Sequence, residues 1–140
     1  MTVSAAALRH EVTHAVLEQY VNKKNLPSWF QEGLAQIAEC SSLCWNYTFS
    51  TTTHPFLPRE TFEKSFLGLD AQDAQVAYKQ SHYLLVILYQ RHGIAGLRQI
   101  VEHLPELDNV ESDRILQQID WSFQGLYEEA QKNWKAQKSF

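Results

Sequence analysis

Two histidines four residues apart, with a glutamate directly after the first, are the residues of this chain best suited to chemistry. They lie in the stretch His10-Glu11-Val12-Thr13-His14. Residues four apart share one face of an α-helix, so both imidazoles can reach one metal ion from the same side. The carboxylate of Glu11 would lie beside them, where it can accept a hydrogen bond from a metal-bound water. This arrangement is typical of zinc hydrolases.

A catalytic zinc ion also needs a third protein ligand and an open position for water. Glu32 follows His14 by eighteen residues and lies one turn into a second predicted helix. The break at Asn25-Leu26-Pro27 lets that helix fold back on the first, so that Glu32 faces the histidines. The next residue, Gly33, costs about 1 kcal/mol relative to alanine inside a helix, which predicts that another backbone or a ligand approaches there. The alternative is an exposed, charged helix face without a metal.

The two histidines, the 17 residues between His14 and Glu32, and the segment Trp29-Phe30-Gln31-Glu32-Gly33-Leu34-Ala35 resemble the gluzincin metallopeptidases. The chain is most similar to the peptidase MA-like domains and the very small minigluzincins. A looser similarity extends downstream, through Ala77-Tyr78-Lys79-Gln80-Ser81, Arg91-His92-Gly93 and Leu97. The resemblance implies a zincin-like fold and a zinc-dependent peptidase that acts on a peptide or protein substrate.

Carried over by position, the resemblance implies that His10, His14 and Glu32 bind Zn²⁺ and that Glu11 is the general base. In this family a tyrosine or histidine of a later helix often stabilises the oxyanion, and Tyr78 and His82 are the candidates here. The alternatives are a core aromatic residue for Tyr78 and a satisfied or exposed histidine for His82.

The chain departs from the family in two respects. Many gluzincins have an acidic residue four positions after the ligand glutamate, where it orients a histidine, but here that position is Gln36. Glu18 or Glu39 is then the candidate partner, since ligating histidines usually donate their second N–H. The family also has a β-sheet before the motif helix, and nine residues precede His10. A catalytically weak or inactive module that binds a protein or peptide partner is therefore the alternative function.

The composition is that of one globular domain. The 140 residues carry a net charge of -4, so we expect no nucleic-acid partner. No apolar stretch approaches the roughly 20 residues of a membrane span, and no signal peptide is visible. We expect a single zincin-like domain over residues 1–140, either complete and then cytoplasmic, or the C-terminal part of a larger protein. Nothing in the sequence indicates an oligomeric state.

The fold is predicted to be mainly α, with at most a very small or truncated sheet, and with the motif helix packed on the helix that carries Glu32. Thr2 or Ser4 can cap the first helix, Ser28 and Gln31 form a capping box for the second, and Asp70 and Ser122 cap later ones. Helices are expected at about 5–22, 28–41, 59–67, 71–92, 94–104, 108–119 and 123 onward, with an extended segment within 42–58.

Two further expectations concern packing. The first helix should bury an apolar face that contains Leu8, Val12, Ala15, Val16 and Tyr20. Cys40 and Cys44 would lie four apart on a helix, which does not favour disulfide geometry. We therefore expect two small buried side chains, with a metal role as the alternative.

Overall fold

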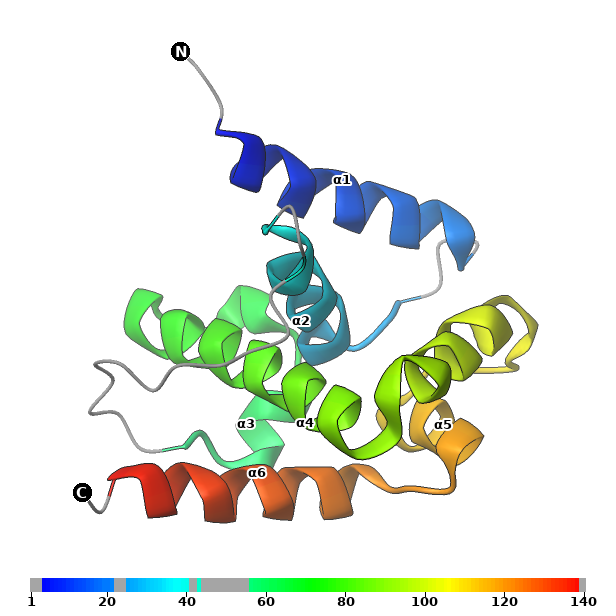
Figure 1. Ribbon diagram of the computed structural model, residues 1–140. Coiled ribbons are helices and arrows are strands. Elements are labelled where there is room, and N and C mark those ends of the chain that lie inside the picture. Colours follow the sequence, from blue (N-terminus) through cyan, green and yellow to red (C-terminus); the bar gives the residue numbers. More distant parts are fainter. Residues whose placement is uncertain (1–3, 22–24, 41–42, 44–55, 139–140) are drawn as a thin grey trace.

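The computed structural model describes residues 4–21, 25–40, 43 and 56–138 (Figure 1). These residues form helices and connecting loops and contain no strand, which confirms the mainly α class. The extended segment predicted within 42–58 lies largely outside them. The elements are α1 (Ala5–Tyr20), α2 (Ser28–Ala38), α3 (Arg59–Glu63), η1 (Phe66–Gly68), α4 (Ala71–His103), η2 (Leu104–Glu106), α5 (Ser112–Leu116), η3 (Gln117–Ile119) and α6 (Phe123–Lys138).

The long helix α4 is the centre of the fold. Helices α2 and α6 pack against it, and α1 packs on α2 at the periphery of the molecule (Figure 1). Aromatic side chains fill the space between these helices. Trp29 and Phe30 of α2 are fully buried, and the Trp29 ring centroid lies 5.4 Å from that of Phe123 on α6. The Trp29 indole N–H donates to Ser112 Oγ at 2.8 Å, so the buried ring has a polar partner.

The glycine of α2 lies where α2 crosses α4. A Cβ atom added to Gly33 would lie 2.7 Å from the carbonyl oxygen of Ser81 and 2.8 Å from Leu85 Cγ. The predicted close approach is therefore confirmed, and the approaching group is the backbone of α4. Glycine at this position lets Glu32, its neighbour, lie directly beside the crossing.

Several predicted helix boundaries are confirmed by their caps. Ser4 accepts a hydrogen bond from the Ala7 N–H, Asp70 from the Asp73 N–H, and Ser122 from the Gly125 N–H. Gly93 has a φ of 69° and a ψ of -178°. The helices predicted on either side of it therefore meet at this kink within α4.

The capping box at the start of α2 was a wrong prediction. Pro27 occupies the N-cap position, and its carbonyl oxygen accepts from the Gln31 N–H at 3.1 Å. The Ser28 hydroxyl instead accepts from the Phe66 N–H at 3.3 Å, so it joins α2 to η1. The Gln31 side chain donates to the Leu26 carbonyl oxygen at 2.8 Å. Both side chains serve tertiary contacts that a local motif does not contain.

The prediction for the cysteines was also wrong. Helix α2 ends at Ala38, and the Leu43 N–H donates to the Cys40 carbonyl oxygen in a turn in which Leu43 has a φ of 67°. Cys40 is exposed and takes part in a disulfide. The other cysteine of the sequence, Cys44, lies outside the described residues. The helical spacing that argued against a disulfide does not apply, because the helix has already ended.

The expected apolar face of α1 is exposed. Leu8, Val12 and Val16 are 57%, 50% and 58% accessible, whereas Leu17 is the buried residue of this helix. Helix α1 carries apolar residues on both sides, so the spacing alone did not identify the side that packs on α2. The packed side contains the polar residues Arg9, His10 and His14.

Candidate metal centre

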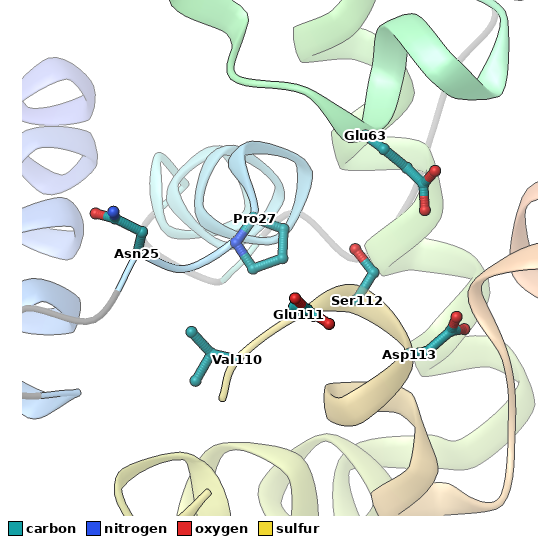
Figure 2. A pocket seen from close by; sticks show the side chains of 7 residues that line it. All are labelled: Asn25, Pro27, Glu63, Val110, Glu111, Ser112 and Asp113. Atoms are coloured by element: carbon teal, nitrogen blue, oxygen red, sulfur yellow. The ribbon is translucent and has the colours of Figure 1, made fainter. Parts of the chain in front are cut away.

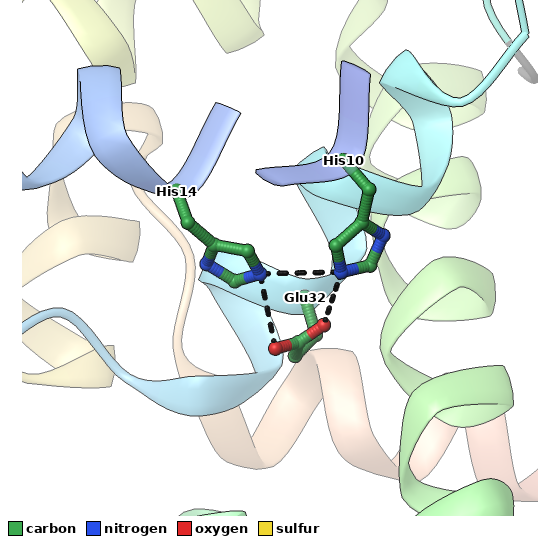
Figure 3. Close-up of side chains that lie close together, drawn as sticks. All are labelled: His10, His14 and Glu32. Carbon is green, nitrogen blue, oxygen red and sulfur yellow. Dashed lines mark hydrogen bonds and ion pairs between the residues drawn. The ribbon is translucent and has the colours of Figure 1, made fainter. Parts of the chain in front are cut away.

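Helices α1 and α2 bring His10, His14 and Glu32 together. The two histidines extend from successive turns of α1 toward Glu32 on α2 (Figure 3). Their Nε2 atoms lie 3.3 Å apart. Glu32 Oε2 lies 3.2 Å from His10 Nε2, and Glu32 Oε1 lies 3.1 Å from His14 Nε2. All three side chains are partly buried, so the group is open to solvent on one side.

These separations fit a tetrahedral zinc site. Zinc binds imidazole nitrogen and carboxylate oxygen at about 2.0–2.2 Å, which places two ligand atoms of a tetrahedron roughly 3.3–3.6 Å apart. The two Nε2 atoms, 3.3 Å apart, are at this spacing, and each carboxylate oxygen of Glu32 lies 3.1 or 3.2 Å from one of them. Among the described residues, this is the group of histidine, cysteine and acidic side chains that could hold a metal ion.

The outer nitrogens of both rings face acceptors. His10 Nδ1 lies 2.6 Å from Glu39 Oε1, and His14 Nδ1 lies 3.4 Å from Gln31 Oε1. The Gln31 amide is oriented by its donation to the Leu26 carbonyl, which leaves Oε1 for His14. Each neutral ring then carries its proton on Nδ1 and presents the Nε2 lone pair to the centre.

When both rings are neutral and protonated on Nδ1, the centre of the group is a cluster of lone pairs. Two Nε2 atoms and two carboxylate oxygens lie within 3.3 Å of a neighbour, and with neutral rings no proton lies between them. Acceptors that face one another in this way repel unless a cation lies between them. The donor set, two imidazoles and one carboxylate, is one that suits zinc.

The partner of His10 comes from the end of α2. Of the two candidates, Glu39 contacts the ring, while Glu18 is exposed on α1. Gln36, at the position where the family has an acidic residue, donates instead to the carbonyl oxygens of Glu32 and Tyr78. Its side chain therefore links α2 to α4 and does not orient a histidine.

Arg9 joins α1 to the same end of α2. Its Nε donates to the carbonyl oxygens of Ala38 and Glu39, at 3.1 and 3.0 Å, and its Nη2 donates to the Glu39 carbonyl as well. Sequence reasoning missed both Arg9 and the role of Gln31. The sequence did contain one signal for Arg9. It lies on the same side of the first helix as His10 and Thr13, and a cation on a side that packs against another helix needs an acceptor.

The structure places the three remaining site candidates differently. Glu11 is exposed on α1, directly after His10. The Tyr78 ring packs edge-on against Phe66 at 6.1 Å, with 39% of the residue accessible, so Tyr78 is not a core aromatic residue. His82 lies one turn later on α4 and is partly buried. Neither belongs to the group that could hold a metal, and their proposed role with the oxyanion stays a prediction.

A separate pocket of about 340 Å³ lies between the start of α2, the end of α3 and the start of α5 (Figure 2). It shares no residue with the metal-competent group. Three of its lining residues have side-chain partners: Ser112 accepts from Trp29, Asp113 accepts from the Phe123 N–H at 2.8 Å, and Glu63 forms an ion pair with Arg59 at 3.2 Å. The pocket is lined by Asn25, Pro27, Glu63, Val110, Glu111, Ser112 and Asp113.

Comparison of the chain with protein-family models, with curated proteins and with solved structures found no match. The resemblance to gluzincins thus rests on the motif residues themselves. Every helix of the described part of the chain is too short or too polar to span a membrane.

Proposed function

We propose that this chain is a zinc-dependent metallopeptidase of the gluzincin type. The observation that carries the proposal is the convergence of His10 Nε2, His14 Nε2 and the Glu32 carboxylate at tetrahedral spacing, with the outer nitrogens of both rings facing acceptors. A general base, Glu11, adjoins this group in the sequence. A site that only holds a metal has no need of that residue.

His10, His14 and Glu32 would hold the metal. Two neutral imidazoles and one carboxylate leave a net positive charge on zinc, which would lower the pKa of a bound water and polarise the substrate carbonyl. Glu11 accepts the proton of the attacking water and then delivers it to the leaving amine. Glu11 is exposed on α1, so its carboxylate is accessible to a substrate.

The reaction also requires a donor for the developing oxyanion. Tyr78 and His82 are proposed for this role from the family resemblance, and both come from α4, which α2 crosses at Gly33. In this reading Tyr78 would have to turn from its contact with Phe66 to reach a substrate. Its partial exposure allows such a rotation.

The test is zinc stoichiometry and cleavage of an unfolded protein substrate by the wild type, by Glu11→Gln and by Glu18→Gln. Both glutamates are exposed on α1, so Glu18→Gln is the matched control for a loss of surface charge. Glu11→Gln should retain its zinc and lose activity by about 10²–10⁴-fold, as expected for loss of a general base. Equal activity of Glu11→Gln and the wild type would refute the proposed peptidase mechanism. A wild type that binds no zinc would refute the metal site.

The second candidate is a zincin-like module that keeps its metal and binds a protein or peptide partner. The exposed side of α1, with Leu8, Val12 and Val16 each at least half accessible, favours it. Apolar surface of this kind on the motif helix is suited to contact with another polypeptide. This candidate predicts zinc uptake without cleavage, and partner binding that is unchanged in Glu11→Gln.

A further inference from the structure

We propose that Glu39 is the positioning residue for His10 and that Arg9 holds it in place. The inference rests on the proposed metal site and assigns its orienting carboxylate to a residue seven positions after the ligand Glu32. The contact is short, at 2.6 Å between Glu39 Oε1 and His10 Nδ1. A carboxylate at this distance fixes both the tautomer and the direction of the ring.

The location of Glu39 argues for a functional role. Glu39 is the C-cap residue of α2, and a negative charge at the C-terminus of a helix opposes the helix dipole. The side chain thus does not stabilise its own helix. Its compensating contact is with His10 on α1, across the interface that forms the metal-competent group.

Arg9 supplies the second part of this arrangement. Its guanidinium donates to the last carbonyl groups of α2, those of Ala38 and Glu39. These groups lack partners within the helix, and a cation is favourable at this end. Arg9 directly precedes His10 and binds the backbone carbonyl of Glu39. This contact therefore holds the backbone of Glu39 close to His10, so that the Glu39 carboxylate can reach the His10 ring.

The usual position for such a carboxylate is occupied by a residue with other partners. The Gln36 amide donates to the carbonyl oxygens of Glu32 and Tyr78, which directs it toward α4. Two side chains of the C-terminal part of α2 therefore have different roles. Gln36 attaches the helix to the core, and Glu39 orients the ligand on α1.

Zinc affinity by chelator competition tests the proposal, in the full chain, for Glu39→Ala, Glu39→Gln and the matched control Glu18→Ala. Glu39→Ala should weaken zinc binding by about 10–100-fold, as is usual for loss of an outer partner of a ligand. Glu39→Gln keeps an acceptor for Nδ1–H and should lose less. In the zinc-free protein, Glu39→Ala loses the contact with His10 but also removes an unfavourable charge at the helix end, so the thermal midpoint should change little.

A second readout does not depend on the metal. In the zinc-free wild type at mildly alkaline pH, nitrogen NMR of His10 should show the Nδ1–H tautomer, and Glu39→Ala should shift the ring toward Nε2–H. Arg9→Ala should weaken zinc binding by the same route, so that combining it with Glu39→Ala adds little further loss. Unchanged affinity and tautomer in Glu39→Ala would overturn the inference. A wild type with the Nδ1–H tautomer but no zinc binding would refute the proposed function and leave the orientation of His10 by Glu39 standing.

Discussion

Substitution of Gly33 by alanine tests the crossing of α2 and α4 on which the placement of Glu32 depends. The new Cβ would lie 2.7 Å from the Ser81 carbonyl oxygen and 2.8 Å from Leu85 Cγ. A leucine side chain can change rotamer, but a helix carbonyl cannot move away without shifting α4. Because the approaching group is a backbone atom, we expect the overpacking to cost about 2–3 kcal/mol, the upper part of the usual range, and the gain in helix propensity returns about 1 kcal/mol.

We therefore expect Gly33→Ala to lower the free energy of unfolding by about 1–2 kcal/mol and the thermal midpoint by roughly 3–8 °C. Urea denaturation followed by circular dichroism measures this. Gly68→Ala is the matched control, because a Cβ there meets nothing within 4 Å. Since α1 packs on α2, the two helices should move together, and zinc affinity should change less than in Glu39→Ala. A Gly33→Ala protein as stable as the wild type would refute the close approach.

Three further predictions follow from other positions. Gly93→Ala should cost about 1–3 kcal/mol in urea denaturation, because only glycine readily adopts a φ of 69° with a ψ of -178°. Burial, assisted by the charge of Arg91, lowers the pKa of His92. The folded state then binds fewer protons than the unfolded state, so stability should fall as the pH drops below about 6.5, and His92→Gln should reduce this slope in the presence of a chelator. Ser112→Ala removes the partner of the buried Trp29 indole N–H and should cost about 1–3 kcal/mol, with a change in tryptophan fluorescence.

The proximity of His10, His14 and Glu32 was predictable because it depends on local geometry. Two histidines four residues apart share a helix face. The break at Asn25-Leu26-Pro27 lets α2 fold back on α1, which brings Glu32 to the histidines. The roles of two glycines in the helices could also be predicted from the sequence. Gly33 and Gly93 are costly in a helix unless a neighbour or a kink requires them, and both reasons are present.

What the sequence did not reveal depends on contacts between distant segments. Gln31 matched a local capping box, yet it contacts His14 and Leu26 because α1 and the preceding loop lie beside it. The buried side of α1 was misassigned because the helix has apolar residues all round, and spacing identifies a face only when the opposite face is polar. Glu18 and Glu39 were equivalent candidates until the end of α2 was placed.

The mode of attachment of α1 has a consequence for the order in which the molecule opens. Within the described residues, Leu17 is the buried side chain of this helix, and its contacts with α2 include those of Arg9 and the facing histidines. A segment with so little buried apolar surface belongs to the low end of the range of local unfolding energies. With neutral rings and no cation, the facing lone pairs would add to that tendency, and a bound ion would turn them into an attachment between α1 and α2. Metal uptake and the docking of α1 would then be one thermodynamic event, visible as protection of the α1 amides from hydrogen exchange.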